Sequence, residues 1–246
     1  MRIAVLSDIH ANLPALEAVL ADAGPVDAVW HLGDVVGYGP EPDGVVDRLR
    51  DVGAVGVRGN HDSAAIGLLD LGEFNDDARA AMEWTQGRIG RSTREWLAAQ
   101  PLRHEAHDAT LVHGSPRDPT WEYVLSAAVA RANLAAFGTR LCLHGHTHVP
   151  IAFREASTAT TTATVVETLG PTPGAVLPLD ERRAMLNPGS VGQPRDGIPE
   201  SSYLVLDLDA PEASWRRVPY DIGSVQDAMR AAKLPWRLVE RLSYGL

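Results

Sequence analysis

The chain is poor in cysteine, in positive charge and in long apolar runs. Cys142 is the only cysteine among 246 residues, which excludes an intrachain disulfide and a thiolate metal cluster. We therefore expect a reducing, cytoplasmic setting. No stretch approaches the roughly 18 apolar residues of a membrane span, and the run Ile3 to Leu6 is too short for the apolar part of a signal peptide.

The deficit of positive charge limits the partners that the chain can bind. Lys and Arg number 22 against 32 Asp and Glu, which gives a formal net charge of -10. Duplex nucleic acid is not an expected partner, because non-specific binding depends on Lys and Arg neutralising phosphates. A small phosphorylated substrate stays possible, since bound cations can reverse the local field. The oligomeric state is left open.

The first third of the chain alternates strand and helix patterns. This β-α-β-α-β order predicts parallel strands joined by right-handed crossovers. The predicted strands are Arg2–Leu6, Ala28–Leu32 and Ala54–Val57, and the predicted helices are Leu13–Ala23 and Val45–Leu49.

The rest of the chain changes from helix to mostly strand and ends in helix. Two packed sheets with helices on their outer faces, an α/β/β/α sandwich formed by one domain over residues 1–246, would satisfy this order. The segment 169–178 is expected to be the turn-rich link of a hairpin. Further predicted helices are Ala78–Trp84, Thr93–Ala98, Val225–Lys233 and Trp236–Leu242, and further strands are His104–Val112, Leu141–Leu143, Val149–Phe153, Thr160–Glu167, Tyr203–Leu208 and Ser214–Pro219.

Five polar clusters follow predicted strands. They supply carboxylate, imidazole and carboxamide groups without thiolate, a set that suits Mn, Fe, Zn, Co or Ni better than Ca or Cu(I). Ligands bind at this edge of open α/β sheets, so we expect the clusters to converge. They are Asp8-Ile9-His10, Gly33-Asp34, Gly59-Asn60-His61-Asp62, His113-Gly114 and Gly145-His146-Thr147-His148.

Taken in order, these clusters resemble the signature of the calcineurin-like metallophosphoesterases. The resemblance extends roughly from Arg2 to Val149, and Asn187-Pro188-Gly189-Ser190 resembles a late strand-end motif of the small bacterial phosphodiesterase-like branch. It implies a two-sheet sandwich with a dinuclear metal site at its edge. It also implies hydrolysis of a phosphomonoester or phosphodiester, with a hydroxide that bridges the metals as the nucleophile.

The resemblance also implies a role for each residue. Asp34 would bridge two divalent ions, and His61 would stand beside the substrate phosphate without binding a metal. Weaker candidates for contact with the substrate are Asn12, Arg58 and Arg195. The first ion would be bound by Asp8, His10, Asp34 and His148, and the second by Asp34, Asn60, His113 and His146.

Each cluster alone has a simpler interpretation. Asp8 could cap the following helix, Gly33-Asp34 could be an ordinary turn, and His113 could be a core histidine. Their joint occurrence in order favours a site. We interpret His144 as structural, because neighbouring residues of an extended chain point to opposite sides.

Two rival functions remain. Some relatives with this fold serve as protein-binding scaffolds, but a complete ligand set together with His61 favours catalysis. A DNA nuclease is disfavoured by the acidic composition. The Thr- and Pro-rich segment 155–183 matches no motif, and the physiological substrate is not predicted.

Overall fold

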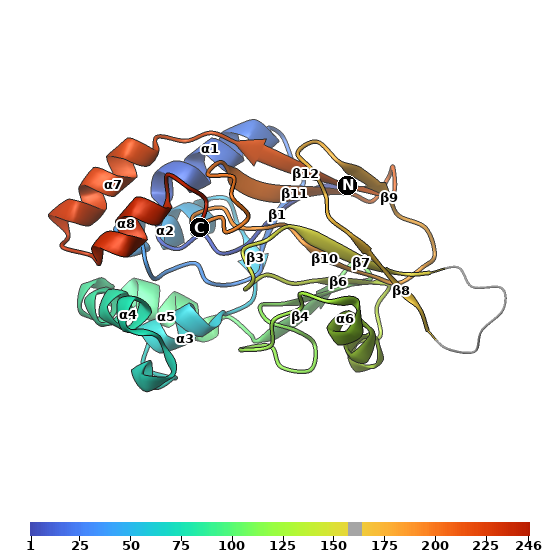
Figure 1. The fold of residues 1–246 in the computed structure, drawn as a ribbon, viewed down its shortest axis with the longest axis horizontal. Coiled ribbons are helices and arrows are strands. Elements are labelled where there is room, and N and C mark those ends of the chain that lie inside the picture. The colour runs from blue at the N-terminus through green and yellow to red at the C-terminus, as the bar shows by residue number, and fades with distance from the viewer. Residues whose placement is uncertain (157–163) are drawn as a thin grey trace.

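Two mixed six-stranded sheets pack together in the computed structural model, which describes residues 1–156 and 164–246 (Figure 1). The first sheet has the order β3-β2-β1-β11-β12-β9, and the second has the order β4-β5-β6-β10-β7-β8. Strands of the first sheet are β1 (Arg2–Leu6), β2 (Ala28–His31), β3 (Val55–Gly56), β9 (Val176–Pro178), β11 (Ser201–Asp207) and β12 (Glu212–Val218). Strands of the second sheet are β4 (Arg103–Ala106), β5 (Ala109–Val112), β6 (Leu141–Leu143), β7 (Ile151–Glu155), β8 (Val166–Leu169) and β10 (Ala184–Asn187).

Helices cover the outer faces of the sandwich and gather at one end of it. In Figure 1 α1 lies over the first sheet, α6 lies under the second, and α3, α4, α5, α7 and α8 lie at the left, beyond the strands. The helices are α1 (Leu13–Ala23), α2 (Pro42–Asp51), α3 (Asn60–Ala65), α4 (Asp76–Arg88), α5 (Arg91–Ala99), α6 (Ala127–Asn133), α7 (Ile222–Ala231) and α8 (Trp236–Arg241).

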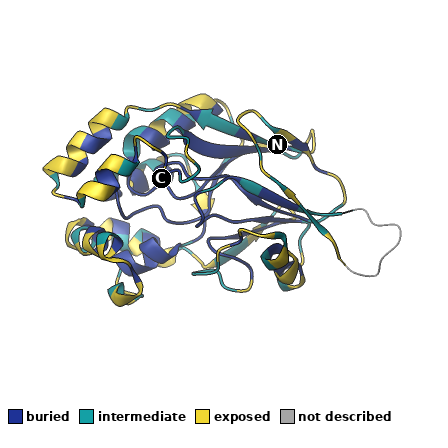
Figure 2. Cartoon of the chain, viewed as in Figure 1, coloured by how far each residue is buried: buried dark blue, intermediate teal, exposed yellow. Residues whose placement is uncertain are grey.

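The strand β1 shows why the central strands are buried on both faces. Successive side chains of a strand point to opposite faces. Ile3 and Val5 therefore join the apolar core between the sheets, whereas Ala4 and Leu6 join the core beneath the helices. Because the helices and the second sheet cover opposite faces, the strand is an almost continuous apolar run, and Figure 2 shows the inner strands as buried.

The predicted sandwich is confirmed, and so are its first elements. The bounds of β1, α1 and β6 are those that the sequence pattern predicts. The C-terminal pair of strands and both C-terminal helices are also present within a few residues of their predicted bounds.

Two predictions of local structure are wrong. The single strand His104–Val112 is instead the hairpin β4-β5, because His107 and Asp108 both adopt positive φ and form a tight turn. The segment 169–178 does not link a hairpin either. β8 pairs with β7 in the second sheet, while β9 pairs with β12 in the first.

The strand predicted at Thr160–Glu167 begins only at Val166, and residues 160–163 lie outside the described part of the chain. The sequence analysis did not anticipate α6 or β10. No helix in the described residues is both long enough and apolar enough to cross a bilayer.

Candidate metal centre

The seven predicted ligands lie where the strand ends of both sheets meet. In the first sheet β1, β2 and β3 are parallel, and in the second sheet β5 and β6 are parallel. Parallel strands place their carboxyl ends at one edge, so residues far apart in sequence come together. The first sheet contributes Asp8, His10, Asp34 and Asn60, and the second contributes His113, His146 and His148.

Backbone strain is concentrated at these strand ends. Ten non-glycine residues of the described chain have positive φ, a conformation that L side chains seldom adopt, and five of them are predicted ligands. Such strain persists where surrounding structure enforces it, commonly at functional sites. The five are Asp8, His10, Asp34, His146 and His148.

Hydrogen bonds between the loops hold the strained backbone in place. The amides of Asp8 and His10 donate to the carbonyls of Gly33 and Asp34, at 3.1 and 3.0 Å. Gly59 allows the loops to approach closely, because a Cβ atom at this position would lie 2.1 Å from Oδ1 of Asp34. The ligand loops are thus fixed against one another before any ion binds.

The loop after β10 braces ligands from both sheets. The Asn187 side-chain amide donates to the Gly145 carbonyl at 2.8 Å, and the Ser190 hydroxyl donates to the Asp8 carbonyl at 2.8 Å. The Gln193 carbonyl accepts a hydrogen bond from Nδ1 of His148 at 2.6 Å. The predicted late motif therefore helps to hold the loops of the predicted ligands in place by hydrogen bonds.

Asp8, His10 and His148 form the first of two buried groups with metal-ligand geometry. Oδ1 of Asp8 lies 3.3 Å from Nε2 of His148 and 3.9 Å from Nε2 of His10. Oδ2 of Asp8 accepts hydrogen bonds from the Ser7 hydroxyl and the His146 amide, at 2.6 and 3.1 Å. Oδ1 is buried and has no hydrogen-bond partner, so this oxygen is available to a cation.

The second group consists of Asp34, His113 and His146, with Asn60 beside it. Nε2 of His113 lies 3.0 Å from Nδ1 of His146, 3.0 Å from Oδ1 of Asn60 and 3.3 Å from Oδ2 of Asp34. The same Asp34 oxygen lies 3.8 Å from Nε2 of His10 in the first group. Asp34 is therefore the carboxylate that lies between the two groups.

Hydrogen bonds to carbonyls fix the tautomers of three histidines. Nδ1 of His10 lies 3.2 Å from the Val36 carbonyl, and Nδ1 of His113 lies 2.9 Å from the Leu32 carbonyl. His148 makes the equivalent bond to Gln193. A carbonyl only accepts, so Nδ1 carries a proton, and in the neutral form of each ring Nε2 has a lone pair that faces the site.

These tautomers leave an unfavourable contact that a cation would relieve. Nε2 of His10 and Nε2 of His148 lie 3.2 Å apart, and with both protons on Nδ1 neither nitrogen has a proton to donate to the other. The buried neighbour Oδ1 of Asp8 adds negative charge and lacks a donor. The donor set of this group thus fits a divalent metal ion.

Burial and mutual charge shift the pKa values of the site strongly. Burial raises the pKa of Asp8 to about 7, and the nearby Asp34 adds to this effect, while His113 opposes it. Burial lowers the pKa of His113, but the Asp34 carboxylate outweighs it and the pKa rises to about 9. Burial opposes ionisation of Asp34 as well, yet the charge of His113 holds its pKa well below the usual range. Bound cations would favour the ionised carboxylates and neutral imidazoles that metal ligation requires.

His61 lies beside His10 of the first group, with 4.9 Å between the ring centroids, and lines an open cavity. It is buried against Tyr38 and Phe74, with ring centroids 4.4 and 5.1 Å away, and burial lowers its pKa to about 4. Its backbone amide donates to Oδ1 of Asp34 at 2.9 Å. The cavity, of about 210 Å³, is lined by His61 and four predicted ligands (Asp34, Asn60, His146 and His148) together with Tyr38, Glu73, Phe74, Asn75, Ala78, Trp121, Tyr123, Arg195 and Arg241.

The three weaker candidates have different surroundings. Arg195 lines the cavity, where its guanidinium donates to the Gln193 side chain at 3.0 Å. Asn12 caps α1 by accepting a hydrogen bond from the Ala15 amide. Arg58 donates to the Ala98 carbonyl at the end of α5, at 3.1 Å. The structure thus brings Arg195 to the cavity but not Arg58, and the side chain of Asn12 is used for capping.

Several cavity residues escaped the sequence analysis. Trp121 and Tyr123 lie in the loop between β5 and α6, and Tyr123 stacks on the ring of His146 at 4.1 Å. Arg241 comes from α8, at the other end of the chain. None of them lies in a motif or follows an apolar strand, so only the tertiary fold reveals them.

The comparisons with known proteins agree with this geometry. The profile of the calcineurin-like phosphoesterase superfamily domain matches residues 1–211. The chain belongs to this superfamily. A metallophosphoesterase structure from Sphaerobacter thermophilus has 46% identity and a TM-score of 0.89 over 100% of this chain and 99% of that chain.

Two curated relatives align with most of this chain. An uncharacterized protein of Methanocaldococcus jannaschii is 34% identical over 250 residues, which are 99% of this chain and 98% of the relative. Phosphodiesterase YfcE of Escherichia coli is 28% identical over 225 residues, 85% of this chain and 89% of the relative. The likeness to the Escherichia coli phosphodiesterase supports the small bacterial branch that the sequence analysis predicted.

Proposed function

We propose that this superfamily member is a hydrolase of phosphoesters that works with two divalent metal ions. The observation that carries the proposal is the contact between Nε2 of His10 and Nε2 of His148 beside the unpartnered oxygen of Asp8. A second group with the same chemistry lies next to it and shares Asp34 with it. The mixed nitrogen and oxygen donors suit Mn, Fe, Zn, Co or Ni.

The chemistry is divided between the metals and the side chains of the cavity. When bound, two divalent ions supply Lewis acidity, which polarises the phosphoryl oxygens and lowers the pKa of water. Asp34 holds the two groups together, and the carbonyls behind His10, His113 and His148 keep their Nε2 atoms turned inward. His61 stands beside the phosphate, where it donates a proton to the leaving oxygen or stabilises the charge of the phosphoryl oxygens.

The substrate is proposed to be a small phosphodiester or phosphomonoester. A diester is supported by the likeness to the Escherichia coli phosphodiesterase. Arg195 faces the same cavity as the ligands, and its buried Nε has no hydrogen-bond partner. This nitrogen is a donor for a phosphate oxygen.

A rate panel tests the proposal. The metal-free protein is reconstituted with each of the five divalent metals and assayed with p-nitrophenyl phosphate, bis(p-nitrophenyl) phosphate and unactivated alkyl esters. We expect hydrolysis that depends on metal and is lost in Asp34→Asn. A protein that binds two ions yet hydrolyses no ester with any metal would instead be a scaffold, and the proposal would be wrong.

A further inference from the structure

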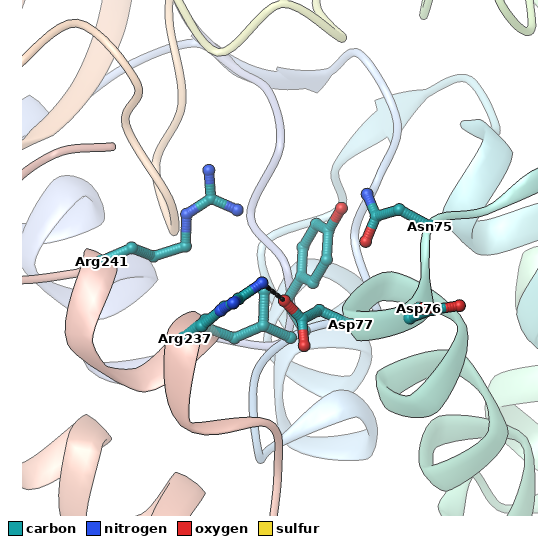
Figure 3. Close-up of a pocket in the computed structure, with 7 residues that line it drawn as sticks. Asn75, Asp76, Asp77, Arg237 and Arg241 are labelled. Carbon is teal, nitrogen blue, oxygen red and sulfur yellow. Dashed lines mark ion pairs between the residues drawn. The ribbon is translucent and has the colours of Figure 1, made fainter.

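A second cavity adjoins the cavity beside the ligands. Its volume is about 510 Å³, and it lies between α8 and the start of α4. Figure 3 shows Arg237 and Arg241 on one side and Asn75, Asp76 and Asp77 on the other. Tyr38, Asn75 and Arg241 line both cavities, so these residues mark the passage from one to the other.

Arg241 is the cation at this passage that pairs with no Asp or Glu side chain of the described residues. In the second cavity Asp76 pairs with Arg79 at 2.7 Å, and Asp77 pairs with Arg237 at 4.0 Å. Nε of Arg241 donates to the main-chain oxygen of Leu246. Within the described chain no Asp or Glu lies within ion-pair distance of Arg241, and its two terminal nitrogens are free for a ligand.

Arg195 and Arg241 place two positive charges at the same cavity. Both line the cavity beside the ligands. Burial lowers the pKa of Arg241, and the positive charge of Arg195 lowers it further. Two partly buried guanidinium groups that repel each other favour negative charge beside each of them, because that charge offsets the repulsion and supplies acceptors for their N–H groups.

The two arginines differ in what they can reach. Arg195 lines only the cavity beside the ligands, whereas Arg241 also lines the second one. A single phosphate held at the ligands and Arg195 would leave Arg241 without an anion. A substrate with a further negative group, attached to the phosphate that reacts, would place that group at the passage.

We propose that Arg241 binds a second anionic group of the substrate, so the preferred substrate is a phosphoester or phosphoanhydride that carries a further phosphate or similar anion next to the bond that is cleaved. This inference rests on the proposed function for its catalytic part only. The binding part depends on Arg241 and the cavity. The remainder of the substrate would extend between α4 and α8.

Anion binding tests the subsite without turnover. The full chain loaded with Mn²⁺ is titrated calorimetrically with inorganic phosphate and with methylenediphosphonate, a pyrophosphate analogue whose P–C–P bridge is not hydrolysed, at equal free Mn²⁺ in cell and syringe. In Arg241→Gln we expect the affinity for methylenediphosphonate to fall about 10- to 100-fold, the factor for one lost hydrogen bond between charged groups, while phosphate affinity changes little. Arg241→Lys keeps the positive charge but not the paired N–H donors of the guanidinium, so it should recover part of the lost affinity.

A matched variant controls for net charge. Arg91 is 91% exposed on α5 and pairs with Glu95, so Arg91→Gln should leave both affinities unchanged. Thermal unfolding checks that every variant is folded. If Arg241→Gln weakened the binding of phosphate and of methylenediphosphonate equally, or weakened neither, the proposed subsite would be wrong.

Kinetics separate this proposal from the function on which it rests. Arg241→Gln should lower kcat/KM for a diester of diphosphoric acid and spare bis(p-nitrophenyl) phosphate, which has one negative charge. Turnover of both esters without any effect of Arg241 would refute the subsite and leave the function standing. Binding of methylenediphosphonate that depends on Arg241, without turnover of any ester, would refute the function and leave the subsite standing.

Discussion

The histidines at the strand ends and the buried pair His31 and His144 have different surroundings, although all of them are buried. The ring nitrogens of His31 have no hydrogen-bond partner, and its ring lies near Trp96, at 5.3 Å between centroids. Nε2 of His144 has no partner either. In contrast, His10 and His113 each have a carbonyl behind the ring and the Asp34 carboxylate in front.

The comparison teaches that burial alone does not make a histidine a ligand. Burial lowers the pKa of His31 to about 4 and that of His144 to about 3, with no carboxylate to oppose it. Such rings stay neutral and act as packing groups. A carbonyl that fixes the tautomer, together with a carboxylate beside the other nitrogen, marks His10, His113 and His148 as candidate metal ligands. Among the described residues no carbonyl partner is seen for His146, which is a candidate because its Nδ1 lies 3.0 Å from Nε2 of His113.

The largest effect is expected at the carboxylate that lies between the two groups. Asp34→Asn removes the negative charge near both His10 and His113, so we expect the bound metal to fall from two ions per chain to almost none and hydrolysis to be lost with it. Metal content is measured by plasma mass spectrometry after gel filtration. His144→Ala is the matched control, because it removes a buried histidine that is not a predicted ligand, and it should keep both ions. The ligand assignment would be wrong if His144→Ala lost the metals and Asp34→Asn kept them.

The next effect separates catalysis from metal binding at one histidine of the site. His61 contacts the cavity, and no carbonyl fixes its ring, whose Nδ1 lies 3.1 Å from the Met82 sulfur. We expect His61→Ala to keep its metals and to lower kcat by about 10²–10⁴, the usual scale for a lost general acid. Its role is then read from the leaving group. If His61 is a proton donor, its loss should lower kcat less for a nitrophenyl ester than for an alkyl ester. If it stabilises charge, its loss should lower kcat equally for both. Full activity on the alkyl ester, or loss of metal, would exclude both roles.

A smaller effect concerns the stability of the folded chain and tests the buried histidines that are not predicted ligands. The imidazole of His31 has a pKa of about 4 in the folded chain and about 6.5 when unfolded. Between these values the unfolded chain takes up a proton that the folded chain does not, so stability falls as the pH falls. The loss amounts to about 2.5 kcal/mol at pH 4.5.

The variant His31→Leu has no imidazole that could take up this proton, and it serves as the comparison. Its free energy of unfolding, measured with denaturant in the presence of a chelator, should fall less between neutral pH and about pH 4.5 than that of the unaltered chain, by about 2.5 kcal/mol. Parallel curves for the two proteins would show that His31 accepts a proton in the folded state and that its surroundings are polar after all.

The smallest effect tests how closely the loops must approach at the ligands. Gly59→Ala places a methyl group 2.1 Å from Oδ1 of Asp34, so the carboxylate must move, and we expect metal affinity to fall about 10- to 100-fold. Gly87→Ala in α4 is the matched control, since its Cβ would meet nothing within 4 Å. It should keep metal affinity and gain up to about 1 kcal/mol of stability. Equal metal affinity in both variants would contradict a rigid Asp34.

Much of the site could be predicted from sequence because its information is local. Asp8 and His113 each follow a short apolar run that forms a strand, and the end of such a strand is fixed within a residue or two by the pattern itself. Asn187 was assigned to a strand end only through the resemblance to the family, because β10 itself was not anticipated. Which residues converge follows from parallel pairing, which alternating strand and helix patterns indicate.

The remaining features depend on contacts that no local pattern encodes. β8 and β9 are neighbours in sequence but pair in different sheets, so composition suggested a hairpin that does not exist. The turn at His107 and Asp108 lacks the Gly or Asn that commonly marks such turns. Arg241 reaches the cavity only because α8 packs against the end of the sandwich, and nothing in its own helix indicates a ligand.

The central claim is that the strand ends hold two ions with Asp34 between them. Anomalous diffraction from a crystal of the Mn²⁺-loaded chain, recorded at the manganese edge, tests it most directly. The account predicts two peaks about 3.5–4 Å apart, one at Asp8, His10 and His148 and the other at Asn60, His113 and His146. A single peak, or ions bound elsewhere while these side chains keep their present contacts, would contradict it.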